Sequence, residues 1–326
     1  MPDRMPETLV VLDPITPTTA AKLRALLPPG LVLTHGTARD ELHLQSIIAD
    51  ADYAISGQIA VNAAILGAAR RLKLLHKWGV GTDNFDLDAA RRLGIKVART
   101  TGSNAVPVAE LTIALMIDCL RSLTHVASEL HEGRWAGGNY ARPAFLLSGK
   151  TVGIVGFGAI GQSVARLLQG FACPILYTKT TPADPETEAR LNARNVPLAE
   201  LLAQADVVSL HCPLTPATTG LIDRAALTAM KRTAILVNVA RGGVVVEDDL
   251  IWALQNRVIH AAAMDVFATE PLPPDSPLVG LDGLTLTPHI AASSADTFDK
   301  TVLQMYGNIG RVARGEAVPE HDSVVG

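Results

Sequence analysis

The stretch TVGIVGFGAIGQSVARLLQG, residues 151–170, decides the fold of this chain. It opens with a short apolar, β-branched run over 151–155, which predicts a buried parallel strand. Gly156, Gly158 and Gly161 then give the pattern G-x-G-x-x-G, and apolar residues recur behind them at helical spacing. A strand, a glycine-rich turn and a helix in this order are typical of a dinucleotide-binding unit.

Each of the three glycines has a physical role in that interpretation. Gly156 permits the tight turn, and Gly158 has no Cβ, so a pyrophosphate can approach its backbone. Gly161 lets the helix pack closely on the strand, and the N–H groups of the helix N-terminus then face the phosphates. A turn that binds nothing would leave three glycines at this spacing unexplained.

Length and composition limit the possible classes of protein. A chain of 326 residues exceeds one compact domain, so two domains are expected. The sequence is 48% hydrophobic and 18% charged, which is an ordinary globular profile. Its net charge of −4 offers no basic footprint, so neither a nucleic-acid nor a membrane partner is expected.

The cysteines and the N-terminal residues indicate a cytoplasmic protein. Cys119, Cys173 and Cys212 lie in or beside apolar stretches, which predicts buried free thiols rather than disulfides or metal ligands. The opening residues MPDRMPETLVVLD lack the continuous apolar segment of a signal peptide. No run reaches about 18 uninterrupted apolar residues, so no transmembrane span is predicted.

Residues 8–100 alternate strand-like and helix-like runs, which predicts a small doubly wound α/β unit. Strands are expected at 8–12, 31–34, 52–55, 72–76 and 96–98, with helices at 18–27, 40–49, 61–69 and 87–93. Glycine-containing loops follow the third and fourth of these strands, and such carboxyl ends are where ligands bind.

The alternation restarts at residue 151 after a different kind of segment. Residues 105–123 predict a helix so apolar that it is buried on all sides, where it can link two domains and also enter a subunit interface. Residues 133–149 predict an irregular arm. Six strands are then expected at 151–155, 174–178, 206–210, 233–238, 260–264 and 283–287. Helices are expected at 159–170, 187–193, 198–204, 223–230, 247–255 and 295–314.

Polar residues follow three successive expected strands of this second unit. Arg241 stands in ARGG, Glu270 in DVFATEP and His289 in TPHIAAS. Taken singly, each has an ordinary interpretation as a loop residue in a surface ion pair or a backbone hydrogen bond. Because the carboxyl ends of parallel strands meet at one edge of the sheet, the three together indicate an active site.

The three side chains suit the reduction of a keto acid. An arginine can hold a carboxylate or a carbonyl oxygen through its rigid fork. A histidine can give a proton to a carbonyl oxygen as hydride arrives, and take it back in the reverse direction. A glutamate beside that histidine favours its protonated form and fixes its tautomer.

The chain resembles the D-isomer-specific 2-hydroxyacid dehydrogenase family, which includes glyoxylate/hydroxypyruvate reductases and phosphoglycerate dehydrogenases. The matching text is VGTDNFD, NAVPVAELTIALMI, KTVGIVGFGAIG, HCPLTPAT, LVNVARGGVV, AMDVFATEPLP and LTPHIAASS. The resemblance implies two doubly wound parallel-sheet domains. A Rossmann cofactor domain, 104–290, is inserted into a flavodoxin-like substrate domain, 1–103 and 291–326. It also implies a homodimer joined through the cofactor domain.

The resemblance also implies roles for individual residues. Arg241, Glu270 and His289 fall on the family's catalytic residues, and Arg241, Val80 and Gly81 on its substrate-binding ones. Asp265 falls on an aspartate that faces the nicotinamide carboxamide. The cofactor contacts implied are Gly156, Gly158, Ala159, Ile160, Gly161, Thr178, Lys179, Cys212, Pro213, Thr218, Val239, Ala240, Asp265 and His289. No metal is expected.

One departure from the family's pattern concerns the cofactor. NAD-preferring members carry an aspartate at the end of the second strand, where it binds the ribose 2′-hydroxyl. Here the sequence reads ILYTKTTP, with Thr178 in that place, Lys179 next, and Asp184 as the first acid. NADP is therefore favoured over NAD, although Lys179 could equally be a surface lysine of an NAD enzyme with a relaxed site.

The sequence thus predicts a reductase that acts on small 2-keto acids, with glyoxylate or hydroxypyruvate as the first candidates. A 3-phosphoglycerate dehydrogenase-type activity stays open, although no further regulatory domain is expected after the last helix. A dinucleotide-sensing, corepressor-like protein is the alternative from another class. Phosphite and formate oxidation are disfavoured, because those relatives carry Lys in place of Val80 and Gln in place of Glu270.

Overall fold

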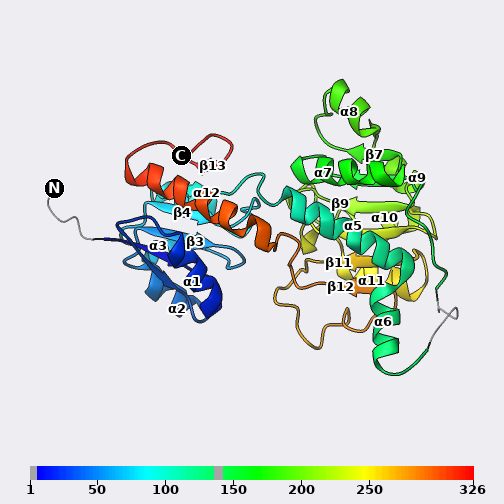
Figure 1. Cartoon of the computed structure of the whole chain (residues 1–326), viewed down its shortest axis with the longest axis horizontal. Coiled ribbons are helices and arrows are strands. Elements are labelled where there is room, and N and C mark those ends of the chain that lie inside the picture. Colours follow the sequence, from blue (N-terminus) through cyan, green and yellow to red (C-terminus); the bar gives the residue numbers. More distant parts are fainter. Residues whose placement is uncertain (1–5, 136–141) are drawn as a thin grey trace. The chain divides into compact units, whose positions relative to one another are not determined.

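The computed structural model describes residues 6–135 and 142–326, and it divides into two units (Figure 1). Unit 1 comprises Met1–Asn104 and Ser293–Gly326, and unit 2 comprises Ala105–Ala292. The first boundary expected from the sequence, between residues 103 and 104, lies one residue before the observed one. The second, between residues 290 and 291, lies two residues before the observed one. Part of the predicted irregular arm, residues 136–141, lies outside the described residues.

Unit 1 is built on a six-stranded sheet in the order β13-β5-β4-β3-β1-β2. The five strands of the N-terminal segment run parallel, and β13 pairs antiparallel with β5. The parallel order 2-1-3-4-5 is that of flavodoxin-like folds. The strands are β1 Glu7–Val11, β2 Leu31–His35, β3 Tyr53–Ser56, β4 Leu74–Lys77, β5 Lys96–Ala98 and β13 Ser323–Val325.

The helices of unit 1 cover both faces of this sheet (Figure 1). One face is covered by α1 and α12, and the other by α2, α3 and α4. The bounds are α1 Pro17–Ala25, α2 Glu41–Ile48, α3 Ala63–Ala68, α4 Leu87–Arg92 and α12 Ala295–Ala313. The first four begin at a capping side chain that accepts a first-turn N–H, supplied by Thr16, Asp40, Asn62 and Asp86.

Unit 2 is built on a seven-stranded parallel sheet in the order β12-β11-β10-β9-β6-β7-β8. The strands are β6 Val152–Val155, β7 Ile175–Thr178, β8 Ala193–Asn195, β9 Val207–Leu210, β10 Ile235–Asn238, β11 Ala261–Met264 and β12 Leu284–Leu286. In chain order this arrangement is 3-2-1-4-5-6 with one additional strand, which is the doubly wound dinucleotide-binding topology. The predicted fold class is therefore confirmed.

The prediction of six strands in this unit was wrong, because the structure adds β8, of which only Ala193 falls inside the helix predicted at 187–193. The predicted helix 187–193 is α8, Pro185–Leu191, which ends at Asn192 in the left-handed conformation with φ of 47°. Ala193 then pairs with Ile175 of β7, so the chain turns directly from helix into an edge strand. A segment of three residues with only one apolar member carries too little periodicity to be recognised.

The helices of unit 2 also form two layers. α5 and α7 pack on one face of the sheet, and α9, α10 and α11 on the other. The bounds are α5 Ala105–Arg121, α6 Leu123–His131, α7 Ala159–Leu168, α9 Leu198–Gln204, α10 Arg224–Ala229 and α11 Glu247–Gln255. Short 3₁₀ helices occupy Gln169–Phe171 and Gly242–Val244.

The apolar helix predicted at 105–123 is shorter and less buried than expected. It ends at Arg121, because Ser122 takes a left-handed conformation with φ of 52° before α6 begins. Ten of its residues are buried, yet Val106 is 49% exposed and Glu110 is also exposed. In the described chain, α5 therefore keeps one row of residues open to solvent.

The cysteines and the apolar helices bear on two further expectations. Cys119, Cys173 and Cys212 are buried free thiols, which confirms that prediction. Among the residues that the structure describes, no helix is both long and apolar enough to cross a membrane.

Candidate active site

The glycine-rich loop lies at the point where the strand order of unit 2 reverses. It follows β6, and its neighbour on the other side of the reversal is the loop that follows β9. A Cβ at Gly156 would lie 2.6 Å from the backbone nitrogen of Cys212, and the φ of Gly156 is 95°. No other residue fits there, so the glycine lets the two loops touch at the switch point.

The helix after this loop presents a free N-terminus. Gly158 is the N-cap of α7, makes no side-chain capping bond, and has no protein atom within 4 Å of where its Cβ would be. A Cβ at Gly161 would meet the carbonyl oxygen of Gly156 at 2.4 Å, so the helix packs directly on the turn. Open space beside uncapped N–H groups, including those of Ala159 and Ile160, fits a pyrophosphate.

The end of β7 offers donors rather than an acid. Thr178 is the last residue of the strand and is half-buried, and Lys179 behind it is exposed. Asp184 does not take the place of the missing acid, because its carboxylate caps α8 by accepting the Thr187 N–H at 2.8 Å. Its pKa is lowered, first by that backbone hydrogen bond.

The remaining predicted cofactor residues lie in the loops after β9 and β10. Thr218 closes the first of these loops, since its hydroxyl donates to the Pro213 carbonyl at 2.6 Å. Cys212, Val239 and Ala240 are each less than 10% exposed. These loops follow adjacent strands, so their residues share one edge of the sheet with the glycine-rich loop.

Arg241 is positioned by a buried side chain that the sequence analysis missed. Asn238, at the end of β10 and fully buried, donates to the Arg241 carbonyl at 2.9 Å and accepts the Ala240 N–H at 3.0 Å. A Cβ at Gly242 would lie 1.9 Å from the carbonyl carbon of Phe267. The arginine turn is therefore pressed against the loop that carries Glu270.

Glu270 and His289 are in direct contact with each other. The Nδ1 atom of His289 lies 2.6 Å from Oε2 of Glu270, and the two side chains are 33% and 26% exposed. The other carboxylate oxygen of Glu270 accepts the Phe267 N–H at 2.9 Å. This contact occupies Nδ1 of the ring and leaves Nε2 as the nitrogen not engaged by Glu270.

The charge state of Glu270 follows from its neighbours. Burial acts to raise its pKa, but the hydrogen bonds from His289 and Phe267 and the charges of His289 and Arg241 outweigh it. The pKa of Glu270 therefore lies below its usual 4.5. An ionised carboxylate at this position stabilises an imidazolium and holds the imidazole in one orientation.

Asp265 holds the segment that carries His289. Its fully buried carboxylate accepts the Thr287 hydroxyl at 2.6 Å and the backbone N–H groups of Ile290 and Ala291, both at 2.9 Å. His289 itself has a φ of 53°, a left-handed conformation that is uncommon for a side chain of its size. The expected contact with a nicotinamide therefore falls on a residue already bonded to three groups of its own chain.

The predicted substrate residues Val80 and Gly81 belong to unit 1, in the loop after β4. Directly before them, the Gly79 carbonyl accepts the Thr100 N–H at 2.8 Å. Trp78 in the same loop packs against Phe298 of α12, with ring centroids 5.9 Å apart. Arg241, Glu270 and His289 belong to unit 2.

A second residue that the sequence analysis missed, on α11, binds the loop of the predicted catalytic residue Glu270. Glu247 accepts the Ala268 N–H at 2.7 Å, next to the turn that holds Glu270. Neither Glu247 nor Asn238 stands out in the sequence, although each lies within six residues of Arg241. In the part of the chain that the structure describes, no group of His, Cys, Asp or Glu is arranged to hold a metal ion.

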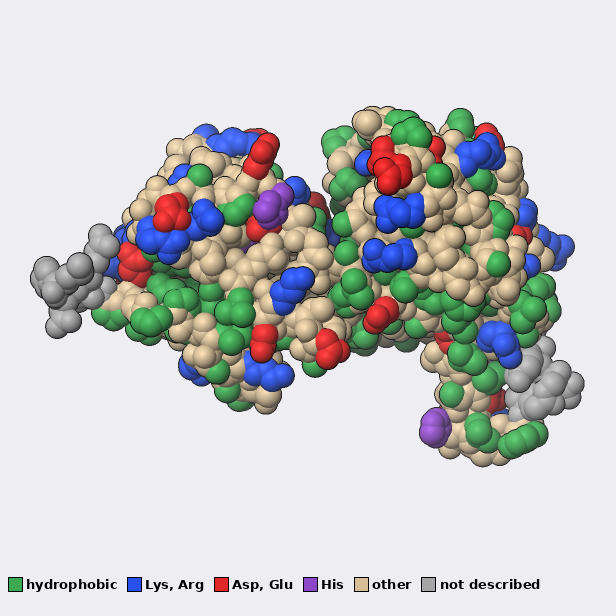
Figure 2. Space-filling model, turned by 45° about the horizontal axis from the view of Figure 1, so that its top comes forward, with side chains coloured by type: hydrophobic (Ala, Val, Ile, Leu, Met, Phe, Trp, Pro, Cys, Tyr) green, Lys and Arg blue, Asp and Glu red, His purple; other side chains and the backbone are tan. Residues whose placement is uncertain are grey.

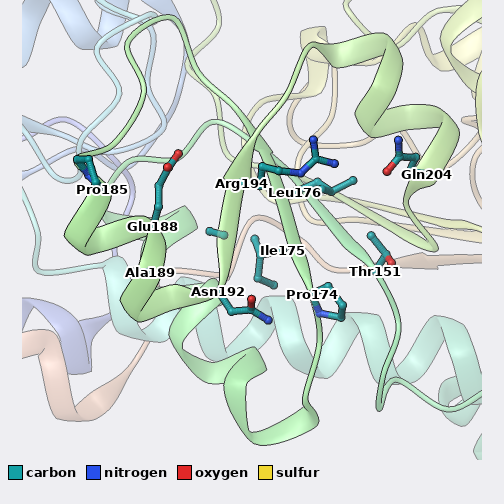
Figure 3. A pocket seen from close by; sticks show the side chains of 11 residues that line it. Thr151, Pro174, Ile175, Leu176, Pro185, Glu188, Ala189, Asn192, Arg194 and Gln204 are labelled. Atoms are coloured by element: carbon teal, nitrogen blue, oxygen red, sulfur yellow. The ribbon is translucent and has the colours of Figure 1, made fainter.

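A cavity of about 650 Å³ in unit 2 lies away from these residues (Figure 3). Its lining includes Thr151, Pro174 and Asn192, which precede β6, β7 and β8 respectively. It therefore opens at the amino ends of the strands, whereas ligands of doubly wound sheets bind at the carboxyl ends.

Comparison with known proteins gives concordant matches. A family model, described as D-isomer specific 2-hydroxyacid dehydrogenase, NAD binding domain, matches residues 113–291. A hydroxypyruvate reductase of Thermotoga maritima is 38% identical over 275 residues, covering 83% of this chain and 87% of the relative. A D-3-phosphoglycerate dehydrogenase of Mycobacterium tuberculosis is 36% identical over 318 residues, covering 98% of this chain. The chain spans 59% of that relative's length.

Among solved structures, the TT0316 protein from Thermus thermophilus is similar over nearly the whole chain. The TM-score is 0.86 at 34% identity, covering 98% of this chain and 100% of the other. A match to an NAD-binding family, together with the open N-terminus of α7, indicates a nicotinamide dinucleotide as the cofactor of unit 2.

Proposed function

The chain belongs to the D-isomer-specific 2-hydroxyacid dehydrogenase family, and on that premise we propose that it reduces small 2-keto acids to D-2-hydroxy acids. Glyoxylate and hydroxypyruvate are the first substrates to test. The observation that carries the proposal is the 2.6 Å contact between Nδ1 of His289 and Oε2 of Glu270, in loops that follow strands of the unit 2 sheet. A histidine held this way is an acid–base group with a fixed orientation.

In the proposed reaction, the residues of this chain move one proton and hold one carbonyl. The bound nicotinamide dinucleotide supplies the hydride. His289, protonated and paired with Glu270, gives its Nε2 proton to the carbonyl oxygen of the keto acid. Arg241 polarises that oxygen or holds the carboxylate, because its guanidinium presents donors in a planar fork.

We assign the binding of the substrate carboxylate to unit 1. The backbone N–H groups of Val80 and Gly81 follow a parallel strand, and such groups serve anions well. In this assignment unit 1 is the substrate domain and unit 2 the dinucleotide-binding domain. The dinucleotide contacts proposed in unit 2 are those of the glycine-rich loop and of the loops after β7, β9 and β10.

We further propose that NADP is preferred over NAD. Thr178 and Lys179 can both donate to a 2′-phosphate. Asp184, the nearest acid in sequence, is engaged in capping α8 and does not replace the missing ribose acceptor. The preference for NADP therefore rests on two effects. No carboxylate repels the 2′-phosphate, and Thr178 and Lys179 attract it.

A homodimer is the proposed assembly, and α6 supports it. This helix has no buried residue, and Leu123 and Leu130 on it are 47% and 56% exposed. Trp135 just beyond it is 85% exposed. Figure 2 shows hydrophobic side chains on the end of unit 2 that α6 forms. A second copy of the chain would bury them. The three free thiols favour a cytoplasmic location for this assembly.

One experiment tests the proposal directly. Purified protein is assayed with glyoxylate, hydroxypyruvate and larger 2-keto acids, each with NADH and with NADPH. 3-Phosphoglycerate with the oxidised cofactors belongs in the same panel, because the Mycobacterium tuberculosis relative is named for that substrate. Turnover of an unphosphorylated 2-keto acid supports the proposal. Tight dinucleotide binding with no turnover of any acid would support a sensing protein instead.

A further inference from the structure

Three buried polar side chains meet inside unit 1, although they come from distant parts of the sequence. His76 lies on β4 and is 0% exposed, Asn308 lies on α12 and is 3% exposed, and Asp322 precedes β13 and is 1% exposed. Burying polar groups lowers stability unless each finds a partner, and apolar side chains would fill the same space at lower cost. Their presence therefore calls for a role beyond packing.

The three side chains form a continuous hydrogen-bonded chain. The amide nitrogen of Asn308 donates to Oδ2 of Asp322 at 3.0 Å and lies 3.1 Å from Nε2 of His76. The Nδ1 atom of His76 lies 2.9 Å from the Lys77 carbonyl oxygen. A carbonyl can only accept, so Nδ1 carries the proton and Nε2 accepts from Asn308. Every contact thus pairs one donor with one acceptor.

This chain of bonds ends on the loop that follows β4. The Lys77 carbonyl accepts from His76 and also from the Thr100 hydroxyl, at 3.2 Å. Thr100 in turn donates its backbone N–H to the Gly79 carbonyl at 2.8 Å. The Thr101 N–H donates to the other oxygen of Asp322 at 3.0 Å. The carbonyl groups of Lys77 and Gly79 are therefore both held by hydrogen bonds, and Asp322 and Asn308 of the C-terminal segment anchor the residues that hold them.

The same loop is also held from its opposite side. The ammonium of Lys77 donates to Oδ1 of Asn84 at 2.8 Å and to the Gly57 carbonyl, and it lies 5.3 Å from the ring centroid of Phe85. Lys77 thus has its side chain tied to the loop after β3 and its carbonyl tied to His76. The backbone between these two attachments has little freedom.

We propose that Asp322, Asn308 and His76 are positioning residues that set the backbone of Lys77–Gly79, so that the N–H groups of Val80 and Gly81 stand ready for the substrate carboxylate. The inference rests on the proposed function of that loop. None of the three residues touches the substrate, and their effect is transmitted through the Lys77 carbonyl. Loss of the chain of bonds loosens the loop and weakens substrate binding in the ground state and the transition state alike.

The kinetic test compares three variants of the full-length protein. His76→Leu removes both hydrogen bonds, and His76→Gln keeps an acceptor for Asn308 and a donor for the carbonyl. Tyr306→Phe is the matched control. Tyr306 lies on α12, the helix of Asn308, and the variant removes a buried hydrogen bond to the Leu23 carbonyl at 3.1 Å. We expect His76→Leu to raise KM for the keto acid roughly fivefold, as one net hydrogen bond would, with kcat nearly unchanged.

His76→Gln should recover most of the parent KM, and Tyr306→Phe should retain it. The dissociation constant of the dinucleotide should not change in any variant, because the cofactor residues belong to unit 2. A role in stability alone would lower the folded fraction, and hence apparent kcat, at constant KM. That pattern, or an equal rise of KM in Tyr306→Phe, overturns the proposal.

A second measurement does not depend on turnover. Amide hydrogen exchange of the peptide that contains Gly79–Gly81 is followed in the parent, His76→Leu and Tyr306→Phe proteins. Faster exchange of this peptide in His76→Leu alone supports the positioning role, and unchanged exchange contradicts it. If the parent turns over no keto acid, the proposed function fails, and the exchange measurement still decides whether the three residues hold the loop.

Discussion

The backbone N–H of His289 donates to the carbonyl oxygen of Asp265 at 2.8 Å. With its carboxylate, Asp265 also binds the hydroxyl of Thr287 and the N–H groups of Ile290 and Ala291. One buried aspartate thus binds the backbone of the histidine itself and the residues on both sides of it. This arrangement explains how His289 keeps a left-handed backbone without a glycine.

Asp265→Asn should therefore disturb catalysis through geometry. An amide would place an N–H group where the parent accepts N–H and O–H donors, so part of the loop must move. A displacement of about 1 Å at a reacting group costs about 10²-fold in rate, which is the loss of kcat expected here. Asp118→Asn is the control, since Asp118 is a buried carboxylate of unit 2 with bonds to Thr124 and Thr285. Equal losses of kcat in both variants would contradict a specific role.

His289→Ala should abolish most turnover and leave dinucleotide binding intact. Loss of a positioned acid–base group typically lowers the rate by about 10²–10⁴-fold. Steady-state turnover measures the first effect, and a fluorescence titration with the reduced cofactor measures the second. A variant with nearly normal kcat would show that His289 is not the proton donor.

Glu270→Gln should change the pH dependence of reduction. In the parent the hydrogen bonds and charges around Glu270 lower its pKa despite burial, so the ionised carboxylate that holds Nδ1 of His289 is lost only when the pH falls through that lowered pKa. A glutamine has no proton to take up, so the decline of activity that protonation of Glu270 causes in acid should be absent from the variant, whose kcat/KM is low throughout. The kcat/KM profile from acid to neutral pH measures the difference. An unchanged profile would place Glu270 outside the site.

Thr178→Asp should reverse the cofactor preference. The parent is expected to show a higher kcat/KM with NADPH than with NADH, and a tenfold preference corresponds to about 1.4 kcal/mol. An aspartate at 178 would accept from a ribose 2′-hydroxyl and repel a 2′-phosphate. Lys179→Ala separates the contribution of the neighbouring charge. A parent that prefers NADH would contradict the proposed preference.

Acid should destabilise the protein partly through His76. Burial is the main cause that lowers its pKa from 6.5 to about 4. Between these two values the unfolded chain binds a proton that the folded protein does not, so the free energy of unfolding falls as pH decreases. His76 accounts for about 1.4 kcal/mol per pH unit, and about 3 kcal/mol in total by pH 4. Denaturant unfolding at pH 7, 6 and 5 should show a shallower dependence in His76→Gln, and an identical slope would refute this account.

The sequence was sufficient to predict the two doubly wound sheets, but not all of their short strands. The alternation of strands and helices was sufficient for the two parallel sheets, because each long element carries a clear apolar period. β8 and β13 were not predicted: β8 has a single apolar residue, and β13 pairs antiparallel with a strand that lies far earlier in the chain. Pairing of Ser323 with Ala98 joins residues too distant in sequence for any local pattern to reveal.

The candidate site shows the same limit. Arg241, Glu270 and His289 could be selected because each follows a predicted strand, and their roles remain predictions that the variants above will test. The residues that hold them could not be selected for that role. Asn238 and Glu247 act through hydrogen bonds to backbone groups of neighbouring loops, and Asp265 holds both sides of His289 from the end of β11. Such roles depend on three-dimensional pairing, which residue type and spacing do not encode.

The division of the chain has a consequence for synthesis on the ribosome. Unit 2 is one continuous segment, whereas unit 1 is assembled from both ends of the chain. Domains fold as they emerge, so unit 2 can be complete while unit 1 still lacks α12 and β13. Until then β5 is an open sheet edge, and the apolar face that α12 will cover is exposed to other nascent chains. Late translation is therefore the stage at which unit 1 leaves the most apolar surface and strand edge uncovered.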